Sequence, residues 1–144
     1  MTDVPPVADA ALAARLQGVL DVPLHRWLGL RLADPADSRA GVVLPVGPPA
    51  LNNVGVLHGG IVAAVLDVAA YVRLLPELAP DEDAVTHDAT CSLVRGVPEG
   101  AEVLLQAELV RRGRTLAFLR SDATVDGAVV AVGTVTKSLL RPRR

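Results

Sequence analysis

The sequence predicts an α+β protein in which one long, apolar helix is covered by an antiparallel β-sheet. Three observations carry this prediction. The 144 residues are enough for a single domain. Residues 61–72 are apolar apart from one carboxylate, which is typical of a buried helix. From residue 84 onward, short apolar stretches alternate with turn signals, which is typical of consecutive antiparallel strands.

Aliphatic side chains dominate the composition. Hydrophobic residues make up 51% of the chain and the mean hydropathy is +0.39, while Trp27, Tyr71 and Phe118 are the only aromatic residues. This is more apolar surface than a monomer of this size needs for its core, so we expect part of it to form a subunit interface. The net charge of −2 provides no field that would attract nucleic acid or an anionic membrane.

We expect residues 1–37 to form an N-terminal helix and lead-in, and residues 38–144 to form the main domain. Before the central helix, the expected elements are a helix over 7–20, a connection over 21–32 that leads into a first strand, a turn over 34–37, a strand over 38–46 and a loop over 50–57. The central helix is expected over 58–75, and turns at 96–100, 112–113 and 126–127 separate the four strands after it.

The apolar run 61–72 is shorter than the roughly 20 residues that a membrane-spanning helix needs, so we expect it in the core. Residues 129–132 are apolar on both faces, which predicts a strand that is central in its sheet or meets another sheet. Cys91 is the only cysteine, so the chain can form no internal disulfide. The first six residues lack the cationic start and apolar stretch of a signal peptide. We therefore expect a cytoplasmic protein.

Asp67 is the one carboxylate in the apolar helix. Its neighbours three and four residues away are alanines and Tyr71. Burying an ionised carboxylate costs several kcal/mol unless it is paired or hydrated. Two interpretations stay open: a backbone group or an arginine inside the fold satisfies Asp67, or Asp67 is a catalytic base in a pocket.

The segment His58-Gly59-Gly60 precedes this helix. Free backbone N–H groups and the positive end of the helix dipole can stabilise an oxyanion there, although two glycines before a helix also suit a tight turn. Gly60 and Asp67 lie seven residues apart, which is about 10 Å along a helix. If the two cooperate on one carbonyl group, the acid must come from a second copy of the chain across a two-fold axis.

The segment 52–67, with Asn52, His58-Gly59-Gly60 and Asp67 at this spacing, resembles the hotdog-fold acyl-CoA thioesterases of the phenylacetic-acid-degradation (PaaI-like) type. The resemblance extends through Arg112-Gly113-Arg114-Thr115 to Thr136-Lys137 and covers about residues 38–140. It implies the hotdog fold, an antiparallel sheet wrapped around one long helix. It also implies a homodimer whose sheets join edge to edge, possibly a dimer of dimers, that hydrolyses an acyl-CoA to a free acid and coenzyme A.

The resemblance also implies roles for individual residues. The Gly59 N–H, helped by Gly60, polarises the thioester carbonyl, and Asn52 donates to or orients the same group. Asp67 of the partner subunit activates water or attacks directly. His58 shapes the turn.

Two further assignments have alternatives. Thr86, on the strand after the helix, assists the reaction, or it belongs to a polar strand face together with Asp88, Thr90 and Ser92. The arginines of the second turn meet the phosphates of coenzyme A, or they form a solvated hairpin. These arginines are Arg111, Arg112 and Arg114.

The sequence offers no metal-ligand spacing, no phosphate loop and no Gly-x-Ser-x-Gly motif. We therefore expect no metal and no cofactor, with coenzyme A entering only as part of the substrate. Two alternative functions stay open. One is a hydratase or dehydratase that acts on acyl thioesters with the same fold. The other is a non-catalytic module that binds acyl-CoA.

Overall fold

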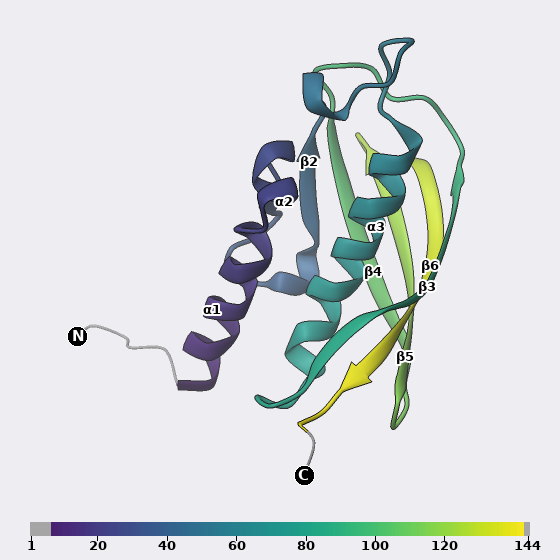
Figure 1. Ribbon diagram of the computed structural model, residues 1–144. Coiled ribbons are helices and arrows are strands. Elements are labelled where there is room, and N and C mark those ends of the chain that lie inside the picture. The colour runs from purple at the N-terminus through teal and green to yellow at the C-terminus, as the bar shows by residue number, and fades with distance from the viewer. Residues whose placement is uncertain (1–6, 143–144) are drawn as a thin grey trace, which may run out of the picture.

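A computed structural model describes residues 7–142 of the chain, with side chains from residue 10 onward. Six antiparallel strands form one sheet in the order β1-β2-β4-β5-β6-β3, and the helix α3 lies against its inner face (Figure 1). The elements are α1 (Val7–Leu20), α2 (Pro23–Leu28), β1 (Arg31–Leu32), η1 (Ser38–Ala40), β2 (Val42–Pro45), η2 (Pro48–Ala50), α3 (Gly59–Leu74), η3 (Leu75–Glu77), β3 (Asp83–Leu93), β4 (Glu102–Arg112), β5 (Leu116–Val125) and β6 (Ala128–Leu140). The predicted sheet around one long helix is therefore confirmed.

The central helix α3 forms where the sequence predicts it. His58 caps its start, since the His58 Nδ1 accepts a hydrogen bond from the Gly60 N–H at 2.9 Å. Pro76 lies in the 3-10 turn η3, where the α-helical part has ended. By length and hydropathy alone, the helical residues 59–77 could cross a membrane. In the fold they pack beneath the sheet, which accounts for their apolar composition.

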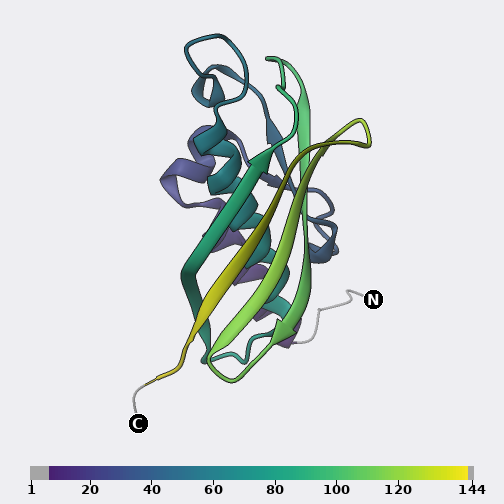
Figure 2. The same cartoon turned by 90° about the vertical axis from the view of Figure 1, so that its right-hand side faces the viewer.

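The two faces of the sheet differ in polarity. On β4 and β5, the side chains that face α3 are mostly apolar and include the buried Leu105, Leu119 and Ala123. The alternate residues, such as Arg120 and Asp122, face solvent. Figure 2 shows this outer face toward the viewer, with α3 behind the sheet and α1 and α2 behind α3. β6 pairs with β5 on one side and β3 on the other, which confirms the predicted central strand.

Three connections differ from the expected ones. Residues 23–28 form the short helix α2, which ends at Gly29 with a φ of 74°, instead of a plain connection. The strand expected over 38–46 begins only at Val42, because Asp37 caps the 3-10 turn η1. The segment 94–101 is a crossover and not a hairpin turn, since β3 lies at one edge of the sheet and β4 lies beside β2.

The strand β3 forms a long open edge of the sheet. It pairs only with β6 among the described strands, and Ala84 is the one buried residue of its eleven. On the face toward α3, Ala89, Cys91 and Leu93 stay exposed. Proteins normally pair, shorten or cover such an edge, because its free N–H and C=O groups can bind another strand.

We predict that Gly133→Ala destabilises the fold. A Cβ at Gly133 would lie 2.6 Å from the Thr90 carbonyl oxygen and 3.3 Å from Leu66 of α3, and backbone atoms cannot move aside cheaply. We expect the free energy of unfolding, measured by urea denaturation, to fall by about 1–3 kcal/mol. Gly18→Ala is the matched control, because a Cβ there meets nothing within 4 Å. It should raise stability by up to about 1 kcal/mol, since alanine favours the helix. Equal effects at the two positions would contradict the prediction.

Candidate active site

The start of α3 presents one free backbone donor. The Gly60 N–H is engaged by the His58 side chain at 2.9 Å, so the two glycines are not equivalent. The structure gives the Gly59 N–H no hydrogen-bond partner among residues 7–142. His58 therefore has the turn-shaping contact expected for it, and Gly59 carries the donor that could polarise a carbonyl group.

Asn52 orders the loop in front of the helix. Its side-chain Oδ1 accepts hydrogen bonds from the backbone N–H groups of Val54 and Val56, at 3.0 and 3.1 Å. The Asn52 backbone N–H also donates to the Val56 carbonyl at 2.8 Å. Because Oδ1 is occupied, the side-chain amide can offer a ligand only its NH₂ group. Asn52 is thus both a turn former and an oriented donor.

Asn52 and Gly59 line the same cavity, of about 270 Å³. Its other walls are largely apolar, with Val62 of α3 and Leu93 at the end of β3. A Cβ at Gly59 would lie 2.7 Å from the Leu93 Cδ1 atom, so a side chain at position 59 would fill this space. The absence of a side chain at Gly59 leaves its backbone open to a ligand.

Asp67 has partners that differ from those expected. The Lys137 Nζ donates to the Asp67 Oδ1 at 2.7 Å, and the Thr86 hydroxyl lies 2.9 and 2.8 Å from the two carboxylate oxygens. Lys137 is almost fully buried, while 29% of the Asp67 side chain is exposed. The interpretation that a backbone group or an arginine satisfies Asp67 is therefore wrong: a lysine and a threonine hold the carboxylate, and one part of it stays open to solvent.

A β-bulge puts Thr86 beside Asp67. The register of β3 against β6 shifts between Thr86 and Asp88, so that Thr86 lies opposite Lys137 and Asp88 lies opposite Thr136. A shift of one residue moves the following side chains to the other face of a strand. The alternative of one polar face is consequently wrong: Thr86 faces α3, whereas Asp88, Thr90 and Ser92 face outward.

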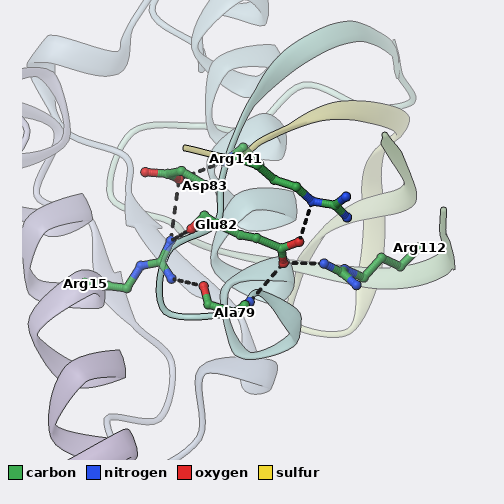
Figure 3. A network of polar contacts seen from close by, with 7 residues as sticks. Arg15, Ala79, Glu82, Asp83, Arg112 and Arg141 are labelled. Atoms are coloured by element: carbon green, nitrogen blue, oxygen red, sulfur yellow. Dashed lines mark hydrogen bonds and ion pairs between the residues drawn. The ribbon is translucent and has the colours of Figure 1, made fainter. Parts of the chain in front are cut away.

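A second ionic cluster surrounds Glu82, which is buried at the start of β3 (Figure 3). Its carboxylate accepts hydrogen bonds from the Ala79 N–H and from the Arg141 Nε, both at 3.0 Å, and it pairs with Arg112. The Ala79 N–H, followed by Arg141 and Arg112, holds the pKa of Glu82 below its usual value. Arg15 of α1 donates to the Glu82 carbonyl at 2.7 Å, which ties the N-terminal helix to this end of the sheet.

This cluster changes the assignment of the three arginines. Arg112 pairs with Glu82, so its guanidinium is not a free phosphate ligand. Arg111 and Arg114 are exposed, so they could still meet a phosphate group. Arg111 and Arg112 differ because adjacent strand residues point to opposite faces of the sheet: Arg112 lies opposite the buried Ala117, and Arg111 lies opposite the exposed Phe118.

Tyr71 links the two ionic clusters. Its hydroxyl donates to the Asp83 Oδ1 at 2.6 Å, and its ring centroid lies 5.5 Å from the Lys137 Nζ. Burial, together with the hydrogen bond and the negative charge of Asp83, raises the pKa of Tyr71 to about 12. Tyr71 therefore stays protonated and neutral at any physiological pH.

The sequence alone indicated no site role for Lys137, which entered only as part of the family resemblance. It is the only lysine of the chain, since the other 13 of the 14 basic residues are arginines. A single lysine among so many arginines is a feature of the composition that could have drawn attention to this residue. Leu93 and Arg95, which line the cavity at Gly59, were also missed, and no local pattern marks them.

Other parts of the described structure bring together fewer groups that could take part in a reaction. The largest cavity, of about 750 Å³, lies between α1 and residues 31–39 and contains none of the predicted site residues. No group of three His, Cys, Asp or Glu side chains within residues 7–142 could hold a metal ion.

Comparisons with known proteins identify similar sequences and structures. The family described as "Acyl-CoA thioesterase N-terminal domain" matches residues 48–138. Human acyl-coenzyme A thioesterase 13 is 32% identical over 120 residues, which are 80% of this chain and 84% of the human protein. For the mouse protein of that name, 32% identity extends over 92 residues, 61% of this chain and 64% of the mouse protein.

Two solved structures are similar in fold and sequence. A variant of the phenylacetic acid degradation protein PaaI from Thermus thermophilus has a TM-score of 0.71 and 28% identity, covering 81% of this chain and 97% of its own. A protein from Bacillus halodurans, solved with CoA, has a TM-score of 0.76 and 25% identity, covering 92% and 85%. Fold and site together define a thioester hydrolase of the hotdog fold. The chain belongs to the acyl-CoA thioesterase family.

We predict that Glu82 makes stability depend on pH below its unfolded-state pKa of 4.5. Because the folded-state pKa is lower, the stabilisation by Glu82 is complete above pH 4.5 and is lost as the pH falls through the folded value. Glu82→Gln should lower the free energy of unfolding at neutral pH, and the difference from wild type should shrink as the pH falls below 4.5. Denaturant titrations of both proteins over this pH range measure the difference in the free energy of unfolding.

Glu108→Gln is the control for this experiment. Glu108 faces solvent and lies 4.0 Å from the equally exposed Arg120, so its loss should change stability by less than about 1 kcal/mol. If the free energy of unfolding, plotted against pH, stays parallel for Glu82→Gln and wild type down to the lowest pH, the proposed role of Glu82 is excluded.

Proposed function

We propose that this protein hydrolyses acyl-CoA thioesters to a free acid and coenzyme A at two sites that the subunits of a homodimer share. One observation carries this proposal: the groups that thioester hydrolysis needs lie at two separate places on α3. Gly59 is the first residue of α3, Asn52 lies in the loop before it, and Asp67 lies eight residues after Gly59. Eight residues of helix span about 12 Å. A single chain therefore holds two half-sites, and a second chain completes each one.

The first half-site stabilises negative charge. When a nucleophile attacks the thioester carbon, the carbonyl oxygen becomes an oxyanion, and the Gly59 N–H and the Asn52 NH₂ group donate to it. Both donors are oriented before the substrate binds, Gly59 by the helix and Asn52 by its Oδ1 contacts. Each such donor typically contributes 10²- to 10³-fold to kcat. Coenzyme A leaves as a thiolate when the oxyanion collapses.

The second half-site supplies the nucleophile. Asp67 of the partner subunit takes a proton from water as the water oxygen bonds to the carbonyl carbon, and this proton then passes to the departing thiolate. Alternatively, the carboxylate attacks the carbonyl carbon directly and water hydrolyses the resulting anhydride. After direct attack, water that adds to the aspartyl carbon of the anhydride leaves ¹⁸O in Asp67 in a single turnover in labelled water, whereas water activation leaves the label only in the released acid.

The open edge of β3 supports the dimer. Its free backbone groups could pair with the same strand of a second copy in an isologous arrangement. The exposed face formed by Ala89, Cys91 and Leu93 would then be covered by the partner. This pairing would bury part of the aliphatic surface that the composition provides in excess. Asp67 lies next to this edge, because its carboxylate accepts a hydrogen bond from Thr86 of β3.

The substrate class follows from the family and from the cavity. The relative from Bacillus halodurans was solved with CoA, and the exposed Arg111 and Arg114 are candidates for the phosphates of CoA here. Arg95 borders the cavity at Gly59 and is a third candidate. The apolar walls would accept an acyl group. The reaction as proposed uses no cofactor and no metal ion, and we place it in the cytoplasm because the one cysteine forms no disulfide within the chain.

We predict that Asp67→Asn lowers kcat for acyl-CoA hydrolysis by about 10²- to 10⁴-fold. Asparagine is preferable to alanine because it keeps the size and shape of the side chain and removes only the carboxylate. Release of coenzyme A from a panel of acyl-CoAs, from short to long and aromatic chains, measures the rate and identifies the preferred acyl group. Asp88→Asn is the matched control: it removes a carboxylate from the outward face of the same region, and its rate should equal that of wild type.

Equal rates for wild type and Asp67→Asn would refute the assigned role of Asp67. Enoyl-CoAs with the same chain lengths test the hydratase alternative, because hydration removes their conjugated double bond. Tight binding of CoA without any turnover would favour the non-catalytic module.

A further inference from the structure

An almost fully buried ammonium group lies beneath the proposed base. Lys137 of β6 directs its Nζ toward α3, where it donates to the Asp67 Oδ1 at 2.7 Å and to the Thr86 Oγ1 at 2.9 Å. The Tyr71 ring centroid lies 5.5 Å from the same nitrogen. The Lys137 side chain is only 4% exposed. The three hydrogens of the ammonium thus have two oxygen partners and an aromatic face around them.

These contacts make the two oxygens of Asp67 unequal. Oδ1 accepts from the lysine and also lies near the Thr86 hydroxyl, whereas Oδ2 lies near the hydroxyl alone. Thr86 has one hydrogen to donate, and Lys137 orients it by donating to the oxygen of the same hydroxyl. Oδ2 therefore keeps more free acceptor capacity than Oδ1. The carboxylate also cannot rotate without breaking the contact to Lys137.

We propose that Lys137 is a positioning residue of the hydrolysis. It fixes the Asp67 carboxylate with Oδ1 held inside the protein and Oδ2 directed at the reacting water or the thioester carbon. The inference rests on the proposed function, because it assigns Lys137 a role through Asp67. Lys137 itself contacts neither substrate nor reacting atoms in this account.

The choice of lysine supports this role over simple packing. A buried ion pair is often no more stabilising than apolar residues of the same volume, so stability alone gives little reason to keep a charge here. The chain uses arginine at its other 13 basic positions and lysine only at this one. An ammonium is a compact donor whose hydrogens point in three directions, whereas a guanidinium is a flat fork suited to one carboxylate. The partners of the Lys137 nitrogen, Asp67, Thr86 and the Tyr71 ring, suit an ammonium group better than a guanidinium group.

We expect Lys137→Met to lower kcat by about 10- to 100-fold with little change in KM, since a misplaced catalytic group costs this much. The decisive readout is the double variant. If Lys137 acts through Asp67, Lys137→Met should have no further effect on kcat in the Asp67→Asn background. Arg73→Met is the matched control, because it removes a cation of α3 that pairs with Glu77 and does not contact Asp67. Its kcat should stay within about twofold of wild type.

A second measurement does not depend on activity. Protein labelled with ¹⁵N-lysine has a single side-chain amine signal, because Lys137 is the only lysine. We expect slow hydrogen exchange for this signal in wild type, and a shifted signal with faster exchange in Asp67→Asn. An amine signal unaffected by Asp67→Asn would overturn the inference, since the contact would then be absent in solution.

The kinetic outcomes separate the two proposals. A Lys137→Met variant with the kcat of wild type, beside an inactive Asp67→Asn, would overturn the inference alone. The same holds if the losses of the two single variants multiply in the double variant, because Lys137 would then act independently of Asp67. Full activity of Asp67→Asn would overturn the role of Asp67, and with it that of Lys137.

Discussion

A straight α-helix keeps residues at its start away from residues in its middle. In this protein, Gly59 and Asp67 lie on the same helix about 12 Å apart, and the sheet holds that helix along its length. Leu66, one residue before the acid, is tied to β5 by the buried Ser121 hydroxyl, which donates to its carbonyl at 3.0 Å. The donors and the acid therefore cannot meet within one subunit, so the proposed chemistry requires a second copy of the chain.

The same helix makes the burial of Asp67 expensive, and the surroundings of this residue follow from that cost. An apolar helix offers no polar neighbour, so the compensating groups come from the sheet: Thr86 at the bulge of β3 and Lys137 on β6. Tyr71, one turn further along α3, covers the ammonium and extends the contacts to Asp83. Through Asp83, Arg15 and the Glu82 cluster, α1 is connected to this end of the sheet. The polar contacts that begin at Asp67 thus continue through β3 and β6 to α1.

Local patterns made much of the fold and half of the site predictable. The apolar run of α3, its capped start and the Asp126-Gly127 hairpin, with positive φ at both residues, depend on neighbours in the sequence. Asn52 and Gly59 lie seven residues apart, so one local pattern at the start of α3 contains both of the proposed donors. Lys137 was missed because its contact with Asp67 joins residues 70 positions apart. The bulge at His87 and the pairing of Arg112 with Glu82 depend on strand register, which no local pattern specifies.

Mixing two inactive variants tests the shared site most directly. Asp67→Asn lacks the base, and Asn52→Ala lacks a donor of the oxyanion site. If each site combines Asn52 of one subunit with Asp67 of the other, a heterodimer of the two variants has one intact site and one site with both defects. Unfolding and refolding an equal mixture makes half of the dimers heterodimers, so activity should return to about a quarter of wild type. No gain over the separate variants, in a mixture shown to contain heterodimers, would contradict the account.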